Sequence, residues 1–458
     1  MLSEFEQNQQ QLQQIVSAVH LLEQTQTHTH QTVEQIVALG EQAKQQIDES
    51  LADCQQSHKL SQQTQEQLKR FVRFLATFLL TVTTPAIDYE QLALQIKQWG
   101  KDLGFAEVGI TDIDLTKHEA QLQRWLDLGY HGEMEYMAAH GMKRARPAEL
   151  VPGTQRVISV KMNYLPPDAS FAKNLKQTDK AYISRYALGR DYHKLIRNRL
   201  KKLGQQIERH IGQLGFRPFV DSAPVLERQL AEKAGLGWRG KNSLLINKEA
   251  GSWFFLGELF VDIPLPIDDE NSFEGCGKCV ACMTLCPTGA IVEPYVVDAR
   301  KCISYLTIEL QGAIPEEYRP LLGNRVYGCD DCQLVCPWNR YGQLTDEADF
   351  HPRKQLKDQD LLTLFAWDEA TFLKNTEGSP IRRIGHERWL RNLAVGLGNA
   401  DYNEQIIEAL EQRLTTASAL VAEHIEWALD QQKNKRQLKL RKTARLIRIV
   451  EKGLPRDA

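Results

Sequence analysis

Eight of the nine cysteines in this 458-residue chain lie between Cys276 and Cys336. The first four form the pattern C-x2-C-x2-C-x3-C-P, which ends at Pro287. Bacterial ferredoxins bind 4Fe-4S clusters with this run, in which two intervening residues let a tight turn present successive sulfurs to neighbouring irons of one cube. The pattern therefore predicts iron-sulfur clusters, and eight thiolates suffice for two of them.

The second cysteine set, C-x2-C-x3-C-P, begins at Cys329 and lacks the leading cysteine of the first set. Cys302 lies upstream, at a distance from which a loop can return it to this set. In ferredoxin runs the cysteine before proline ligates the other cluster. We therefore predict that one cluster is bound by Cys276, Cys279, Cys282 and Cys336, and the other by Cys286, Cys302, Cys329 and Cys332. We expect the clusters to lie close enough for electron transfer between them.

Two structural alternatives to iron-sulfur clusters fit the cysteines less well. Zinc ribbons use pairs of C-x2-C motifs rather than a triple run closed by C-x3-C-P. Disulfide frameworks belong to secreted scaffolds far shorter than this chain. Cys54, isolated in a glutamine-rich segment, is interpreted as an incidental thiol.

The composition is that of an ordinary globular protein, with 42% hydrophobic and 25% charged residues and a net charge of -3. This charge disfavours a wholesale polyanion binder, although local basic patches remain compatible with it. The sequence contains no uncharged apolar run of about 18 residues and no export signal. We therefore expect a cytoplasmic protein without membrane contact.

Four segments with different patterns predict a multidomain protein of mixed α/β and α+β class. Residues 1–82 are rich in glutamine with a broken three-four apolar spacing, which predicts a helical extension, either a coiled coil or the product of a misassigned start codon. Residues 87–265 alternate helix and strand patterns and predict an α/β domain. Residues 266–345 predict a ferredoxin-like domain. Residues 346–458 predict helices throughout.

Particular elements of the α/β and helical domains can be placed by their apolar periodicity. We expect helices at residues 89–104 and 193–214, and strands at 105–110, 156–164, 216–220 and 252–263. Residues 389–398 and 421–429 resemble one another about 35 residues apart. That period indicates HEAT-like helical repeats, with ordinary helix packing as the alternative.

The end of the chain carries basic residues of one sign on an amphipathic helix. They are Lys433, Lys435, Arg436, Lys439, Arg441, Lys442, Arg445 and Arg448. A solvated helix face is the alternative, but the single sign favours a nucleic-acid contact.

Three polar segments of the α/β domain are candidate functional loops. They are residues 184–193, 221–228 and 235–243. Asp221 follows an expected strand, where α/β sheets bind ligands, although a helix N-cap explains an aspartate there equally well. The glycine-rich segment 235–243 fits neither common phosphate-binding spacing.

These segments, the stretch Arg144-Ala-Arg-Pro147 and the two cysteine sets occur in the order seen in epoxyqueuosine reductases. From Ile87 onward the chain resembles that family, which reduces the epoxide of epoxyqueuosine at the wobble position of tRNA to give queuosine. The family uses a cobalamin and two 4Fe-4S clusters, and it is related to reductive dehalogenases. The resemblance implies that Asp221 is the proton donor. It also implies a corrinoid pocket lined by Arg144, Ser184, Asp221, Lys241, Asn242 and Ser243.

The resemblance implies an oxidoreductase whose substrate is tRNA carrying epoxyqueuosine in the anticodon. We expect a monomer that receives electrons from an external one-electron donor such as flavodoxin or ferredoxin. We also expect Asp221 to hold its proton near neutral pH, because a partly dry pocket disfavours the carboxylate. A reductive dehalogenase-like enzyme acting on a small molecule and a non-catalytic two-cluster electron carrier are the alternatives.

Overall fold

The structure, a computed structural model, describes residues 39–46, 69–73, 87–167, 169–270, 273–434 and 441–453. Its contacts divide the chain into two units, Met1–Asp88 and Tyr89–Ala458. In the first unit residues 39–46 and 69–73 are helical. Most of the residues whose spacing predicts a coiled coil lie outside the described residues, and so does Cys54.

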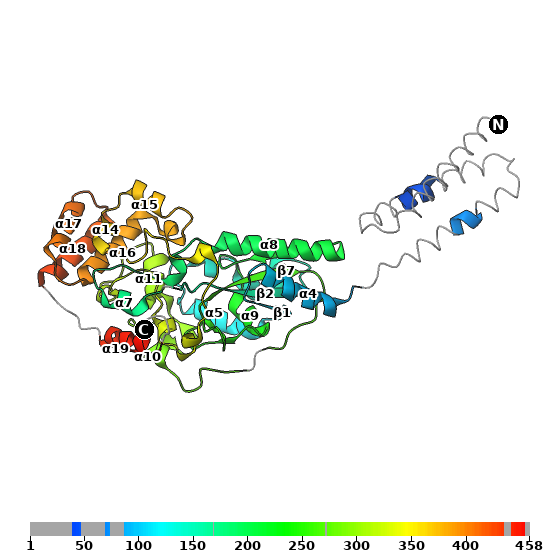
Figure 1. The fold of residues 1–458 in the computed structure, drawn as a ribbon, viewed down its shortest axis with the longest axis horizontal. Coiled ribbons are helices and arrows are strands. Elements are labelled where there is room, and N and C mark those ends of the chain that lie inside the picture. The colour runs from blue at the N-terminus through cyan, green and yellow to red at the C-terminus, as the bar shows by residue number, and fades with distance from the viewer. Residues whose placement is uncertain are drawn as a thin grey trace, which may run out of the picture. The chain divides into compact units, whose positions relative to one another are not determined.

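A four-stranded sheet forms the centre of the second unit (Figure 1). Its order is β1 (Glu107–Thr111), β2 (Arg156–Asn163), β7 (Phe254–Val261) and β4 (Phe216–Phe219). The expected strands and the mixture of helix and strand are confirmed. Every pairing in this sheet is antiparallel, however, so the rule that placed ligands at the carboxyl ends of parallel strands does not apply to Asp221.

Helices cover both faces of the sheet. α4 (Tyr89–Asp102) and α8 (Tyr192–Ile211) pack together on one face, where they bury Ile158 of β2. α9 (Glu227–Lys233) packs on the other face, whose apolar cluster contains Val157. Because successive side chains of a strand point to opposite faces, a strand covered on both sides reads as a continuous apolar run. The remaining α-helices and strands described before the cysteines are α5 (Glu119–Asp127), α6 (Pro147–Leu150), α7 (Phe171–Lys176), β3 (Tyr182–Ile183), β5 (Trp238–Arg239) and β6 (Leu245–Ile246).

The cysteine segment consists of short elements and loops. They are α10 (Ala281–Leu285), β8 (Ile291–Glu293), β9 (Val296–Val297), α11 (Ile303–Ile308), α12 (Arg319–Leu322), β10 (Arg325–Tyr327) and α13 (Asp331–Leu334). β10 pairs in parallel with β3, and α10 packs against α13. The two cysteine runs are thereby brought together and fixed to the segment that precedes α8.

Helices follow the cysteines, as expected. They are α14 (Leu361–Phe365), α15 (Glu369–Asn375), α16 (Gly385–Asn399), α17 (Glu404–Leu414), α18 (Ala419–Asn434) and α19 (Arg441–Gly453). Within α16, the buried Arg391 donates to the carbonyl oxygens of Leu306 and Leu310, each at 2.8 Å, and so ties this helix to the cysteine segment. α19 packs against α7, α10 and α13 and buries Leu446 and Val450 (Figure 1). No described helix has the length and apolar character needed to cross a membrane.

Candidate active site

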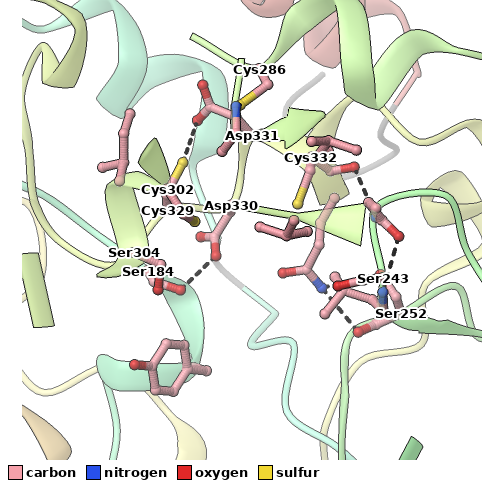
Figure 2. Close-up of a pocket in the computed structure, with 18 of the residues that line it drawn as sticks. Ser184, Ser243, Ser252, Cys286, Cys302, Ser304, Cys329, Asp330, Asp331 and Cys332 are labelled. Carbon is pink, nitrogen blue, oxygen red and sulfur yellow. Dashed lines mark hydrogen bonds between the residues drawn. The ribbon is translucent and has the colours of Figure 1, made fainter. Parts of the chain in front are cut away.

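A cavity of about 410 Å³ lies between the sheet region and the cysteine segment. Four cysteines line it, namely Cys286, Cys302, Cys329 and Cys332. Asp221 lines it as well, although it lies more than 60 residues before the first of these cysteines. Figure 2 shows the four cysteines around the cavity together with Ser184, Ser243 and Asp330. One cavity therefore joins the second predicted ligand set to the predicted proton donor.

The other four cysteines form a separate neighbourhood. Burial, together with the charges of Cys276, Cys282 and Cys279 as thiolates, raises the pKa of the Cys336 thiol to about 12. Cys336 thus lies near the three cysteines of the other run, an arrangement that supports the predicted exchange of ligands between the runs. No three His, Cys, Asp or Glu side chains in the described ranges converge on a point that could hold a single metal ion. The cysteines of a cubane bind separate irons and need no such point.

Lys241 supports the turn of the first cysteine run. Its Nζ donates to the carbonyl oxygen of Gly277 at 2.6 Å and to that of Cys279 at 3.0 Å. Gly277 has a φ of 42°, a left-handed conformation that favours glycine. The glycine-rich segment 235–243 therefore holds the C-x2-C turn by a side-chain cation instead of forming a phosphate loop.

Asp330 fixes the cavity wall next to the second cysteine run. This buried carboxylate accepts hydrogen bonds from the Ser184 hydroxyl at 2.5 Å and the Tyr182 hydroxyl at 2.9 Å. The neighbouring Asp331 pairs with the Arg325 guanidinium through two hydrogen bonds of 2.7 and 2.8 Å. The positions of Ser184 and of the cysteines thus depend on the same buried network.

Asp221 lies in a bend after β4 with a φ of 50°, so its backbone is left-handed. Its side chain is 58% exposed and accepts a hydrogen bond from the Tyr192 hydroxyl. The Asp221 backbone N–H donates to the Glu227 carboxyl. The N-cap interpretation is wrong, because the residue that caps α9 is Leu226, without a side-chain hydrogen bond.

His193, near the start of α8, lies between two carboxylates. Its Nδ1 is 2.7 Å from Asp191 Oδ1, and its Nε2 is 3.4 Å from Asp221 Oδ2. Arg383 donates to Asp191 Oδ2 at 3.0 Å and lies against the same imidazole. Burial by itself would lower the pKa of His193, but the hydrogen bonds to Asp191 and Asp221 outweigh it and raise the pKa.

Asp221 responds in the opposite direction. Burial would raise the pKa of its carboxyl, yet the hydrogen bonds from His193 and Tyr192 and the charges of His193 and Arg383 lower it. The lowered pKa is opposite in direction to the expectation that Asp221 holds its own proton near neutral pH. His193 Nε2 lies 3.4 Å from Asp221 Oδ2, so the imidazole is the neighbouring group that can pass a proton to this carboxylate.

The predicted pocket residues separate into two groups. Ser184, Asp221, Asn242 and Ser243 line the cavity. Arg144 and Lys241 lie outside that lining: Arg144 is buried and donates to the carbonyl oxygens of Tyr136 at 2.9 Å and Ala223 at 3.2 Å. It thereby supports the loop that follows Asp221.

Sequence reasoning does not single out Asp330, which lines the cavity, Arg383, which contacts His193, or Glu258, which lies in β7 outside the cavity lining. Nothing in the sequence links Arg383 to His193, because 190 residues separate them. Asp330 stands in the sequence as an intervening residue of a cysteine motif. The sequence could have indicated Glu258, because it is the one acidic residue in the apolar strand β7.

The chain is similar to known proteins over most of its length. Residues 144–222 match the family model "Epoxyqueuosine reductase QueG, DUF1730", and residues 275–339 match the "4Fe-4S double cluster binding domain". Epoxyqueuosine reductase of Salmonella typhimurium is 66% identical over 385 residues, which cover 83% of this chain and 100% of that protein. The chain belongs to the epoxyqueuosine reductase family. It is therefore an oxidoreductase with a double 4Fe-4S domain, and the interpretation as a non-catalytic electron carrier is wrong.

Other epoxyqueuosine reductases give the same result. The enzyme of Vibrio cholerae is 66% identical over 81% of this chain and 100% of its own length. A crystal structure of an epoxyqueuosine reductase with an epoxyqueuosine-modified stem loop of tyrosine tRNA shares the fold, with a TM-score of 0.69 and 24% identity. It covers 79% of this chain and 99% of the solved one.

Proposed function

We propose that the chain reduces epoxyqueuosine to queuosine in the anticodon of tRNA, in the cavity that joins Asp221 to Cys286, Cys302, Cys329 and Cys332. The single observation that carries this proposal is that shared cavity. A reduction needs an electron source and a proton source at one place. Cluster ligands on one wall and a carboxylate beside a protonated imidazole on another supply both.

The chemistry of the cavity wall fits the cobalamin that the family resemblance implies. Its hydroxyl and amide groups include Ser184, Ser243 and Asn242, which suit the amide-bearing rim of a corrin ring. Its aromatic groups include Tyr164 and Phe255, which suit the ring's faces. When bound, cobalamin supplies low-valent cobalt as a two-electron reductant. The protein's part is to hold the ring, orient the substrate and deliver protons.

Electrons enter at the cysteines that lie farther from the cavity. Cys279 of the set Cys276, Cys279, Cys282 and Cys336 is exposed, so an external one-electron donor such as flavodoxin or ferredoxin can approach that cluster. The other four cysteines line the cavity, so the cluster that they bind is the inner one. The packing of α10 on α13 brings the two cysteine runs together, as electron transfer requires.

Protons reach the substrate through His193 and Asp221. The protonated imidazole gives its Nε2 proton to Asp221 Oδ2, and Asp221 gives a proton to the epoxide oxygen. Opening the epoxide to the alkene consumes two electrons and two protons and releases the oxygen as water. Asp191 holds the imidazole by its Nδ1 atom, so that Nε2 faces Asp221.

The tRNA substrate rests on the family and on the related complex with a modified stem loop. A wobble base must leave its stack to reach a cavity of this kind. The described cations of α19, namely Arg445, Arg448 and Lys452, surround a second cavity of about 500 Å³ together with Arg340. We keep the basic end of the chain as a contact for the tRNA backbone, although residues 435–440 lie outside the described ranges.

Each part of the chain has a separate task in this proposal. Residues 87–265 hold the cobalamin, 266–345 form the ferredoxin-like domain, and 346–458 form a HEAT-like helical domain. Residues 1–82 are an appended helical extension without a part in the chemistry. The enzyme acts as a cytoplasmic monomer.

Anaerobic purification tests the proposal. Iron, sulfide and corrin analysis should give two clusters and one cobalamin per chain, and the protein should convert epoxyqueuosine to queuosine in tRNA. Dehalogenation of a small molecule without conversion of tRNA would overturn the proposed substrate. A chain that binds no corrinoid would overturn the assignment of the cavity.

A further inference from the structure

Glu258 is a fully buried carboxyl in the central strand of the sheet. It lies opposite Phe219 of β4 and Ser159 of β2, and its exposure is 0%. Within the described structure, neither of its carboxyl oxygens meets a hydrogen-bond donor, and the Ser159 hydroxyl is likewise without a partner. A buried carboxyl with no donor is expensive to ionise, so it requires an explanation.

The group that faces Glu258 is another carboxyl, that of Glu227 at the start of α9. A carboxylate has only acceptor atoms, so two carboxyls can hydrogen-bond only when one of them holds a proton. With that proton, the pair resembles the carboxylate dyads in which like charges prevent both groups from ionising together. Two carboxyls that face one another in this way therefore require a shared proton.

The same Glu227 carboxyl accepts the backbone N–H of Asp221. This hydrogen bond fixes the residue whose φ of 50° is costly for a non-glycine residue. Arg144 holds the other side of the loop through the Ala223 carbonyl oxygen at 3.2 Å. The Glu227–Glu258 pair is therefore one of two supports of the Asp221 loop.

Charged and titratable groups from all the packed elements determine how this pair titrates. Glu227 faces Asp221 after β4, Tyr192 and His193 on α8, Arg144 and Glu258. Glu258 faces Glu227 and Asp221. Arg144, the one guanidinium in this set, directs its hydrogen bonds to backbone carbonyls. Around the pair, the carboxylate of Asp221 is therefore accompanied by the imidazole of His193 and the guanidinium of Arg144.

We propose that Glu227 and Glu258 share one proton, and that this protonated pair positions Asp221 by holding its backbone N–H. The inference rests on the proposed function, since it assigns a positioning role for the same site. While the proton is present, Glu227 lies against Glu258 and fixes Asp221 toward the cavity. When the proton is lost, the two carboxylates repel each other and the hold on Asp221 is released.

The direction of the pKa shifts agrees with this geometry. Burial, followed by the charge of Asp221, raises the pKa of Glu227 to about 8. Burial and the charge of Glu227 also raise the pKa of Glu258. Because the folded protein retains a proton that the unfolded chain loses near pH 4.5, the folded state loses stability as pH rises from that value to about 8. Above pH 8 the pair is charged.

Glu258→Gln tests the proposal, because its amide can donate permanently to the Glu227 carboxylate. The variant should keep wild-type turnover near pH 7 and lose the part of the alkaline fall in kcat that wild-type shows near pH 8. Glu227→Gln, whose amide can accept from Asp221 and donate to Glu258, should behave in the same way. Glu227→Ala, which removes the acceptor, should lower kcat at every pH. Glu317→Gln, at an exposed glutamate, is the matched control.

A second readout does not depend on activity. Infrared spectroscopy should show the C=O stretch of one buried protonated carboxyl, which disappears as pH rises through about 8 and is missing from Glu258→Gln. Failure of the tRNA assay would leave this band unaffected, so it separates this proposal from the proposed function. A Glu258→Gln protein with the wild-type pH profile, or a wild-type spectrum without the band, would overturn the proposal. If Glu258→Gln does not fold, the same two results are read from Glu227→Gln.

Discussion

His193 Nε2 lies 3.4 Å from Asp221 Oδ2, and the imidazole is held on its other side by Asp191 at 2.7 Å. The hydrogen bonds of this arrangement raise the pKa of His193, while those of Asp221 lower the pKa of the carboxyl. In the proposed mechanism the two residues act as one acid. The imidazole stores the proton, and the carboxylate, 58% exposed at the cavity, passes it on.

Asp191→Asn should move the alkaline limb of the kcat profile to lower pH. The negative charge of Asp191 helps to keep His193 protonated, so its loss lowers the pKa of His193, and the acid form disappears earlier as pH rises. Asparagine remains a good helix N-cap, so α8 should stay intact. The pH dependence of kcat measures the effect. A limb that does not move, or that moves to higher pH, would show that His193 is not the proton store.

Cys336→Ser should damage the cluster held by Cys276, Cys279 and Cys282, although Cys336 belongs to the other motif. The reason is the exchange of ligands between runs, which the neighbourhood of Cys336 supports. Anaerobic iron analysis should fall from about eight irons per chain toward four, since each cubane holds four. Loss of the cluster on Cys329 and Cys332 instead, measured by electron paramagnetic resonance of the reduced protein, would reverse the assignment.

Deletion of residues 1–81 should leave an active enzyme with both clusters and cobalamin. The contacts of the chain divide after Asp88, and every residue of the candidate site lies in Tyr89–Ala458. Iron and corrin content and turnover of the truncated protein measure the outcome. A truncated protein without cobalamin would make the extension part of the catalytic unit.

Changing Arg445, Arg448 and Lys452 together to Gln should weaken tRNA binding and flatten its salt dependence. All three side chains are exposed on α19. Each cation that neutralises a phosphate adds roughly 0.7 to 0.9 to the steepness of log affinity against log salt, so its removal should lower the slope by that amount. Lys374→Gln, at an exposed position of α15, is the control. Unchanged tRNA affinity, combined with slower reduction by a protein electron donor, would assign this surface to that donor.

The sequence predicts the cysteine segment in the most detail, because the ligands of a cluster lie close together in the chain and their spacing is visible there. Cys276, Cys279 and Cys282 are set by one tight turn, and their spacing alone predicts a cluster. The strand positions are also predictable from apolar runs. Their direction is not, since periodicity is the same for parallel and antiparallel strands, and β2 between β1 and β7 is antiparallel to both.

Long-range electrostatics explains what the sequence does not predict. The protonation of Asp221 depends on Arg383 and His193, which arrive from different parts of the chain. From the sequence, a carboxyl in a pocket is expected to be neutral, and only the fold shows that an imidazole lies next to it. Arg144 is a second example. Its motif is recognisable in the sequence, but the sequence does not show that its side chain supports the Asp221 loop.

Turnover of Asp221→Asn on epoxyqueuosine-containing tRNA tests the central claim most directly. The amide has nearly the shape of the carboxylate and can still accept from Tyr192, but it cannot pass a proton from His193. The variant should keep its clusters and its cobalamin and lose roughly 100- to 10,000-fold in kcat, the usual effect of removing a general acid. Near wild-type turnover by a fully loaded Asp221→Asn enzyme would contradict the account.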